Sequence, residues 1–434
     1  MIVRTGCIFF LLCASLMASA QTISIQGVAP DYAGTTLRFC TYSDYITYAE
    51  DNIMECTVDA SGNFSGNGHL AHEGMVFARS GIYFIYFYAL PDGAYTLHLP
   101  PYEAKSSADS LNPFYEELPI HAGVHTTAAG DINRLMLEGD CKPAGNAGYE
   151  AYCRYREGME KYQSVKQKVR YLSVNYFRDQ PALYYNEAYM DLFNQIYGRY
   201  FEFAHRQDAR LTAIINRQQG LSALKTFLLR DSTFRDNAVL ELVILKNLYD
   251  NFYANIFQHE GLLSLAKEIE ATTPYHEHKT IAGNIIHRVT LLMPGYAPPP
   301  FELYDTEGAL HRLDEFRGKA LYLIFCKVFS YGVINAFEKL FTLHNVYRDV
   351  MNVAVISVDD DPAQLKNFRD RERYRWHFLH YSHNPDILKQ YDIKALPTYF
   401  LLDKEGKLLL SPAPSPFGNI EDSFMKLHDE ASRQ

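Results

Sequence analysis

The spacing of apolar residues divides the chain into three regions, and the first region predicts β-structure. From residue 22 to about residue 125, short runs rich in β-branched and aromatic residues alternate with turn residues such as Pro91-Asp92-Gly93. The runs that predict strands are TISIQGV, TTLRFCTY, IMECTV, MVFAR, GIYFIYFY and AYTLHLP. The Gly-containing turn at Asp59–Asn63 favours a hairpin. We expect residues 21–128 to form a small antiparallel β-sandwich.

The second region, residues 129–292, predicts helices. Leu242, Leu245 and Leu248 recur at intervals of three, which is the spacing of one face of a helix. Similar patterns before and after them predict an all-α region of about five or six helices that packs the flanking domains together. The segment Met293–Pro300 that follows is dense in proline and glycine, so it marks a domain boundary.

The third region, residues 293–434, alternates apolar strands with helices. KALYLIFCKVF and MNVAVISVDDD are continuous apolar runs of the kind that is buried on both faces of a sheet. PAQLKNFRDRERY is a helical pattern that begins at Pro362, a residue type favoured in the first turn. Turns at Thr306–Gly308 and Lys404–Gly406 predict two hairpins. This order predicts an α/β domain with a mixed sheet.

The first 20 residues have the pattern of a cleaved secretory signal. Arg4 supplies a short basic segment, Cys7–Leu16 is apolar, and Ala18-Ser19-Ala20 offers the small residues that signal peptidase needs. A membrane span would need about 20 continuous apolar residues, and neither this run nor any later one reaches that length. We expect residues 1–20 to be removed after Ala20 and the protein to be exported to the periplasm or cell envelope.

Composition limits the classes of partner. The net charge is −10 at pH 7, which argues against nucleic acid or an anionic membrane surface as the main partner. There are 33 Tyr and 27 Phe but only one Trp, and for so many tyrosines we favour half-buried packing. The expected partner is an unidentified envelope protein or peptide.

An exported chain permits disulfides. Of the cysteines beyond the signal, Cys40, Cys56, Cys141 and Cys153 lie in the first half of the chain, and four cysteines allow three pairings. Proximity in sequence favours Cys40 with Cys56 and Cys141 with Cys153. The alternative is that all four are reduced and buried. Cys326 has no other cysteine near it in sequence.

Four motifs in the third region are similar to those of the TlpA/ResA-like, AhpC/TSA-related exported thioredoxins. Pro299–Leu303 resembles the entry strand, and LDEFRGK at Leu313–Lys319 resembles the lead into the central strand. Ile356–Asp359 matches a second strand that ends on an acidic residue. Tyr391–Asp403 resembles the family's cis-proline strand, with Pro397 as the proline. The resemblance implies a thioredoxin fold in a multidomain member and a thiol-disulfide oxidoreductase ancestry.

The sequence departs from the family where the chemistry takes place. The family carries Cys-x-x-Cys just past the first buried strand, and here Ser330 and Val333 stand at those positions, with Phe329 at the preceding aromatic position. A hydroxyl cannot form a disulfide, and valine cannot resolve one. We therefore expect a binding or structural protein without dithiol activity. The alternative is an oxidoreductase or peroxidase that uses Cys326 alone, which would require an exposed thiol with a depressed pKa.

A retained cis-proline also allows a peptide groove. On the family pattern, such a groove would be lined by Phe329, Tyr331, Leu396, Pro397 and Thr398. The competing interpretation is that Pro397 is purely architectural.

Histidine clusters do not predict a metal site. His377, His380 and His383 recur at intervals of three and would point to both faces of a strand, and His276-Glu277-His278 lacks the metalloprotease spacing. For the stretch that includes His377–His383 we favour a polar loop. No nucleotide-binding or hydrolase motif occurs, so we expect neither a metal nor a cofactor.

Overall fold

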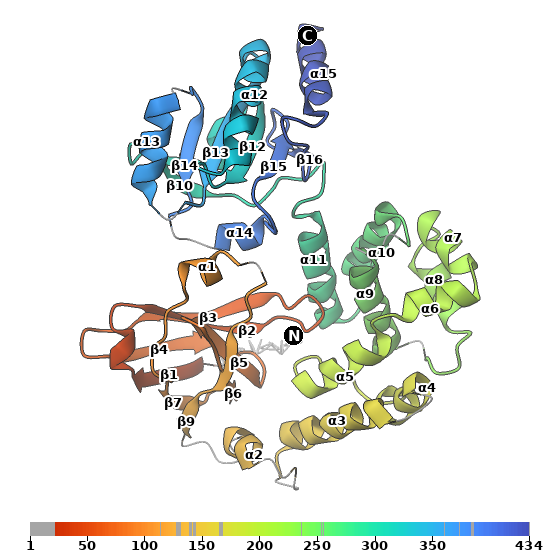
Figure 1. The fold of residues 1–434 in the computed structure, drawn as a ribbon. Helices are drawn as coiled ribbons and strands as arrows, with labels where there is room; N and C mark the ends of the chain where they lie inside the picture. The colour runs from red at the N-terminus through yellow and green to blue at the C-terminus, as the bar shows by residue number, and fades with distance from the viewer. Residues whose placement is uncertain are drawn as a thin grey trace, which may run out of the picture.

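The computed structural model describes residues 22–433, except 113, 127–131, 139–140, 142–144, 165–167, 236, 253, 255, 360, 373 and 383–385. Three regions follow one another along the chain (Figure 1): a β-sandwich in red and orange, helices in yellow and green, and an α/β domain in cyan and blue. The predicted signal segment lies outside the described residues. Among those described, no helix combines the length and the apolar character needed to cross a bilayer.

The β-sandwich has two sheets around one apolar core. One sheet has the strand order β4-β1-β7-β9 and the other has the order β3-β2-β5-β6-β8. The elements are β1 (Thr22–Val28), β2 (Thr36–Tyr42), β3 (Glu50–Thr57), β4 (Asn63–His69), β5 (Gly74–Ser80), β6 (Tyr83–Ala89), β7 (Ala94–His98), α1 (Ser107–Ser110), β8 (Leu118–His121) and β9 (Gly123–Thr126).

Two sequence predictions for this domain are wrong. The turn at Asp59–Asn63 does not close a hairpin, because β3 pairs with β2 while β4 pairs with β1 in the other sheet. The sandwich is not purely antiparallel either, since β1 pairs with β7 and β6 with β8 in parallel. Strand pairing joins segments that are far apart in sequence. The alternation of apolar and polar residues along one strand does not specify which strand pairs with it.

The five-stranded sheet is apolar on both faces. Ile85 and Phe87 of β6 point into the sandwich core, while Phe84, Tyr86 and Tyr88 alternate with them and point to the other side. Helices of the middle region lie on this second side and bury Tyr88, while Phe84 and Tyr86 stay half-buried. The run GIYFIYFY therefore has apolar character at every position because one face packs in the sandwich core and the other faces the helices.

The middle region contains more helices than the sequence predicts. Short breaks such as the one at Gly198 divide long apolar patterns into separate helices. In the described residues these are α2 (Ile132–Glu138), α3 (Ala147–Ser164), α4 (Lys168–Leu172), which continues into a π-helical turn (Ser173–Phe177), α5 (Glu187–Tyr197), α6 (Tyr200–Gln207), α7 (Arg210–Asn216), α8 (Leu221–Leu228), α9 (Ala238–Phe252), α10 (His259–Thr272) and α11 (His276–Thr290).

A buried polar network lies at the centre of this region. Glu241 of α9 is only 1% exposed. It accepts Nδ1–H of His278 at 2.8 Å, forms an ion pair with Lys225 at 2.9 Å, and accepts the hydroxyl of Thr273. The other ring nitrogen of His278 lies 2.9 Å from the hydroxyl of Tyr184. The network therefore ties α8, α9 and α11 together, and its polar atoms are satisfied although they are buried.

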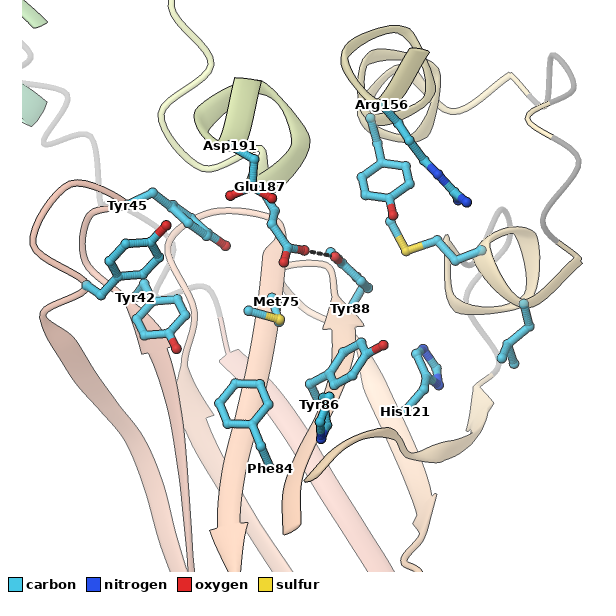
Figure 2. A pocket seen from close by; sticks show the side chains of 15 residues that line it. Tyr42, Tyr45, Met75, Phe84, Tyr86, Tyr88, His121, Arg156, Glu187 and Asp191 are labelled. Carbon is cyan, nitrogen blue, oxygen red and sulfur yellow. Dashed lines mark hydrogen bonds between the residues drawn. The ribbon is translucent and has the colours of Figure 1, made fainter. Parts of the chain in front are cut away.

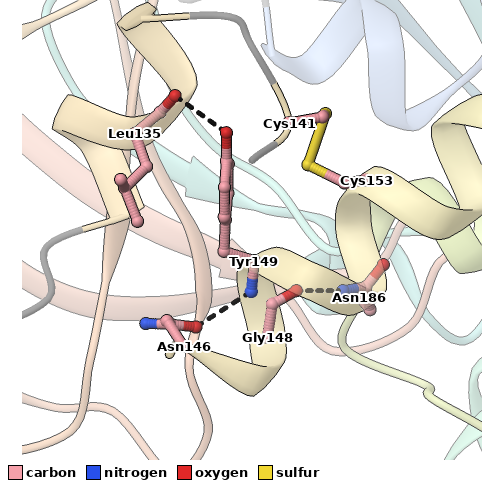
Figure 3. Close-up of a disulfide and its surroundings, with 7 residues drawn as sticks. All are labelled: Leu135, Cys141, Asn146, Gly148, Tyr149, Cys153 and Asn186. Atoms are coloured by element: carbon pink, nitrogen blue, oxygen red, sulfur yellow. Dashed lines mark hydrogen bonds between the residues drawn. A yellow bond between two sulfur atoms is a disulfide. The ribbon is translucent and has the colours of Figure 1, made fainter. Parts of the chain in front are cut away.

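One disulfide fixes the start of the helical region (Figure 3). Cys141 and Cys153 are bonded, with 5.5 Å between their Cα atoms and 12 residues between them in sequence. This predicted pair is confirmed, and the chain-entropy treatment gives such a loop about 3 kcal/mol. The predicted Cys40–Cys56 pair is wrong: both thiols are free and buried. In the β2–β3 register, Cys56 lies opposite Leu37 and Cys40 lies opposite Asn52.

The C-terminal domain has a mixed seven-stranded sheet with the order β11-β10-β14-β13-β12-β15-β16. The two predicted hairpins are present as β10–β11 and β15–β16. The elements are β10 (Glu302–Asp305), β11 (Leu310–Arg312), a 3-10 turn (Leu313–Phe316), β12 (Ala320–Cys326), α12 (Tyr331–Tyr347), β13 (Met351–Ser357), α13 (Pro362–Glu372), β14 (His377–His380), α14 (Asp386–Gln390), β15 (Thr398–Leu402), β16 (Leu408–Leu410) and α15 (Ile420–Ser432).

Specific contacts join the three regions. Asn284 of α11 donates to Ser43 and Asp44 in the loop after β2 at 2.9 and 2.8 Å. The segment after α11 then adds to the C-terminal domain, since Gly295 and Tyr296 exchange backbone hydrogen bonds with Leu408. The helices therefore hold the sandwich on one side and lead directly into the α/β domain on the other.

Candidate functional site

The predicted reactive position lies where β12 ends and α12 begins. Ser330 is the N-cap residue of α12, and its carbonyl oxygen accepts the N–H groups of Val333 and Ile334 at 3.0 and 3.1 Å. The Ser330 side chain is exposed, whereas Val333 in the first turn is buried. The start of a helix carries partial positive charge, so it is the place where a thiolate would be stabilised. The group present there is a hydroxyl.

A buried carboxylate holds the loop in front of α12. Asp359 follows β13, and its Oδ2 accepts Val328 N–H at 2.9 Å and the Ser357 hydroxyl at 2.6 Å. Nδ1 of His380 accepts the Ser382 N–H at 2.9 Å, so Nε2 carries the proton that is donated to the Asp359 carbonyl at 2.8 Å. The loop is thus fixed from inside the domain, and the side chains of residues 329–331 are exposed.

Cys326 does not have the properties that one-cysteine chemistry needs. It is the last residue of β12, and its side chain is 0% exposed. Burial raises the pKa of its thiol well above the ordinary value, and the nearby negative charge of Asp359 raises the pKa further. The thiolate is the reactive form of cysteine, and here it is strongly disfavoured. The buried position of Cys326 counts against the alternative prediction of an oxidoreductase or peroxidase that works through this thiol alone.

We expect no thiol of the folded protein to react with Ellman's reagent. Cys40, Cys56 and Cys326 are buried, and burial raises the pKa of each thiol. The measurement is thiol titration of the chain without its first 20 residues, before and after denaturation in guanidinium. All three thiols should react only after denaturation. Rapid reaction in the native state that disappears in Cys326→Ala would contradict the buried position of this residue.

The end of β12 lies beside the strand that follows the predicted cis-proline. β12 pairs with β15 so that Phe325 faces Thr398, and extension of this register places Cys326 opposite Pro397. The loop that leads to Ser330 therefore lies next to Pro397. The Leu396–Pro397 peptide bond is cis, as the sequence predicts.

The apolar side chains at this edge are open to solvent. Tyr331 is 81% exposed, Phe329 43% and Leu396 38%. The ring of Phe329 is held edge-on against Phe368, with 5.7 Å between the ring centroids, so it is presented in a fixed orientation. The hydroxyl of Thr398 donates to the Ala395 carbonyl at 2.6 Å within the turn that contains the cis bond. Three large apolar side chains are therefore exposed on the segments that follow β12 and precede β15.

The histidines of the C-terminal domain do not converge. His377 and His380 lie on β14, where His377 is exposed and His380 is buried, and His383 falls outside the described residues. The interpretation of this stretch as a polar loop is wrong, because β14 pairs in parallel with β13. Within the described part of the chain, no group of three or more His, Cys, Asp or Glu residues is arranged to hold a metal ion.

Sequence reasoning missed a second site, a pocket of about 530 Å³ between the sandwich and the helices (Figure 2). The pocket lies over the second face of β6, and residues of helices α2, α3 and α5 line its other side. Its lining includes the aromatic residues Tyr42, Tyr45, Tyr48, Phe84, Tyr86, Tyr88 and Tyr152. The alternation of Phe84, Tyr86 and Tyr88 along one strand is the sequence signal that could have indicated it.

Comparison with known proteins gives matches in the C-terminal domain. Residues 294–410 match the AhpC/TSA family. The thiol-disulfide oxidoreductase ResA of Geobacillus thermodenitrificans is 29% identical over 130 residues, which cover 30% of this chain and 74% of that protein. ResA of Bacillus thuringiensis subsp. konkukian is 30% identical over 118 residues, which cover 26% and 66%.

The comparison with solved structures also gives matches. The thioredoxin domain of a thiol-disulfide oxidoreductase from Bacteroides vulgatus matches with 19% identity and a TM-score of 0.28. The match covers 33% of this chain and 97% of that chain.

Proposed function

The C-terminal domain belongs to the TlpA/ResA-like branch of the AhpC/TSA thioredoxin-fold family, and from this premise we propose that the protein is an exported binding module without dithiol redox activity. The observation that carries the proposal is the exposed hydroxyl of Ser330 at the start of α12, with buried Val333 one turn further. Thiol-disulfide exchange requires a thiolate at the first position and a second thiol that resolves the mixed disulfide. Neither group is available here.

Export is supported by two features. The first 20 residues have the composition of a secretory signal. The Cys141–Cys153 disulfide forms and persists in oxidising compartments such as the periplasm. The protein would then act in the cell envelope, where an unfolded or extended polypeptide is an available partner.

The surface that would bind is the apolar edge around the cis-proline. Phe329, Tyr331 and Leu396 are exposed beside Pro397, where pairing between β12 and β15 ends. An extended peptide laid across residues 395–397 would bury these side chains, and each large apolar side chain that is fully buried contributes about 1.5–3 kcal/mol. The loss of redox chemistry leaves this surface in place, because it depends on the fold and not on the thiols.

Substitution of the groove residues tests the proposal. We expect the double variant Tyr331→Ala/Leu396→Ala to bind fluorescein-labelled, reduced and carboxymethylated lysozyme about tenfold more weakly than the unsubstituted protein, because two apolar anchors are removed. The measurement is fluorescence anisotropy. Phe417→Ala, which removes another exposed aromatic ring of the same domain, should leave binding unchanged. Equal affinities for all three proteins would mean that Pro397 is only architectural.

A further inference from the structure

The tyrosine-lined pocket has aromatic walls on more than one side. The face of β6 contributes Phe84, Tyr86 and Tyr88, and the loop after β2 contributes Tyr45 (Figure 2). Tyr48 of the same loop also lines the pocket. Neighbouring rings lie at contact distance: the centroids of Phe84 and Tyr86 are 6.2 Å apart. Aromatic faces carry negative charge density, so an enclosure of rings attracts a cation more strongly than a neutral group of the same shape.

Two carboxylates are placed at the helix side of the same pocket. Glu187 and Asp191 are one turn apart on α5, and the Tyr88 hydroxyl donates to Glu187 (Figure 2). Among the residues that the structure describes, neither carboxylate forms an ion pair. Burial raises the pKa of Glu187, although the hydrogen bond from Tyr88 opposes the rise. Burial and the charge of Glu187 raise the pKa of Asp191 to about 6. The described part of the chain therefore places two carboxyl groups one turn apart in this pocket, with no ion pair to either of them.

The basic groups that line the pocket do not neutralise this pair. Arg156 of α3 is exposed, and its side chain extends away from Glu187 and Asp191 (Figure 2). His121 of β8 stands edge-on to Tyr86, with 5.4 Å between the ring centroids, and its ring nitrogens contact the Ala122 carbonyl and Asn133. A positive charge that enters between the rings and the carboxylates would meet only attractive groups on these two sides.

We propose that this pocket binds an organic cation, an ammonium group carried on an apolar chain. The ammonium group would lie against Glu187 and Asp191, and the chain would lie between the rings of Phe84, Tyr86 and the tyrosines of the β2 loop. A neutral ligand would stack on the same rings but would leave both carboxylates uncompensated in a partly buried site. The volume of about 530 Å³ lies in the range of small-ligand pockets. The ammonium group can come from a free amine or from a lysine side chain of a polypeptide.

Titration calorimetry with hexylammonium and 1-hexanol separates charge from apolar contact. The mature chain should bind hexylammonium, and 1-hexanol should bind at least about tenfold more weakly, because it has the same chain without the charge. Equal affinity of the two probes, or no binding of any ammonium probe, would overturn the proposal. The peptide acetyl-Gly-Lys-Gly-amide is the third probe: tighter binding than hexylammonium assigns the cation to a polypeptide, and weaker binding assigns it to a free amine.

Matched variants locate the site. Glu187→Gln/Asp191→Asn should lower hexylammonium affinity about tenfold or more and leave 1-hexanol affinity unchanged. Tyr86→Leu should lower hexylammonium affinity through loss of a ring face. Glu405→Gln, which removes an exposed carboxylate in another domain, is the control. It should change neither the hexylammonium affinity nor the 1-hexanol affinity. Because Glu187 is partly buried, the double variant could unfold. If its circular dichroism spectrum is not that of the folded protein, Asp191→Asn alone takes its place. Unchanged hexylammonium affinity in a folded carboxylate variant would contradict the proposal.

Discussion

Replacement of Ser330 and Val333 together by cysteine is expected to raise the thiol-disulfide exchange activity of this domain above that of the unsubstituted chain. Ser330 is exposed at the N-cap of α12, and Val333 is buried in the first turn, so one new thiol would be presented to substrate and the other would lie behind it. A helix N-terminus lowers a thiol pKa to about 3.5–7.5, which raises the thiolate fraction at pH 7 by a factor of about 8 to 30 over that of a free cysteine.

The assay is turbidimetric reduction of insulin in the presence of dithiothreitol. The unsubstituted chain should not exceed the rate with dithiothreitol alone, and the double variant should clearly exceed it. The two single variants are matched controls. Ser330→Cys alone can attack a disulfide but cannot resolve the mixed disulfide, and the thiol of Val333→Cys alone is buried. Activity of the unsubstituted chain that is lost in Cys326→Ser would contradict the proposed function, and an inert double variant would show that more than the two thiols has been lost.

Glu241→Gln is expected to lower the free energy of unfolding of the helical region by about 3–5 kcal/mol, because it breaks a buried charge pair. Glu241 is 1% exposed, and it bonds to His278, Lys225 and Thr273. An amide in its place cannot pair with the ammonium group of Lys225, and its NH₂ group opposes the donors that surround it. The measurement is urea denaturation followed by circular dichroism at 222 nm.

Glu260→Gln is the control for this substitution. It removes an exposed carboxylate from the first turn of α10 and should cost no more than about 0.5–1 kcal/mol. A Glu241→Gln variant as stable as this control would mean that the network contributes nothing to the fold.

The same carboxylate predicts the direction of the pH dependence. Burial raises the pKa of Glu241, but hydrogen bonds from His278, Lys225 and Thr273 outweigh burial and lower the pKa from 4.5 to about 2. A depressed native pKa stabilises the fold above the unfolded pKa, and the contribution is lost as the pH falls from 4.5 towards 2. The loss amounts to about 3 kcal/mol. Urea midpoints across this pH range should therefore fall less steeply in Glu241→Gln than in the unsubstituted chain.

The sequence predicted local features well. The buried strands β12 and β13, the helix that begins at Pro362 and the turns at Thr306–Gly308 and Lys404–Gly406 all occur where the pattern placed them. These features depend on residues close in sequence: continuous apolar runs, a fixed φ at proline and turn residues. The strand β14 was not predicted, because its four residues HFLH mix apolar and histidine side chains and so lack a continuous apolar run.

The predictions that failed concern pairing across the chain. Cys40 and Cys56 are close in sequence on consecutive strands, but the β2–β3 register separates them. Neither this register nor the parallel β6–β8 pair is encoded in the alternation of a single strand. The disulfide at Cys141–Cys153 was predicted correctly because loop and helix bring nearby residues together there.

By itself, the sequence determined which atoms are available for chemistry. A hydroxyl at residue 330 and a valine at residue 333 cannot exchange disulfides in any conformation, so the absence of the Cys-x-x-Cys pair needed no structure. Only the tertiary structure decided the surroundings of the remaining groups: that Cys326 is buried, that Glu241 meets His278, and that tyrosines from distant segments enclose Glu187. Burial and charge pairing arise when elements far apart in sequence pack together, and this is why the tyrosine-lined pocket and the polar network became visible only in the folded chain.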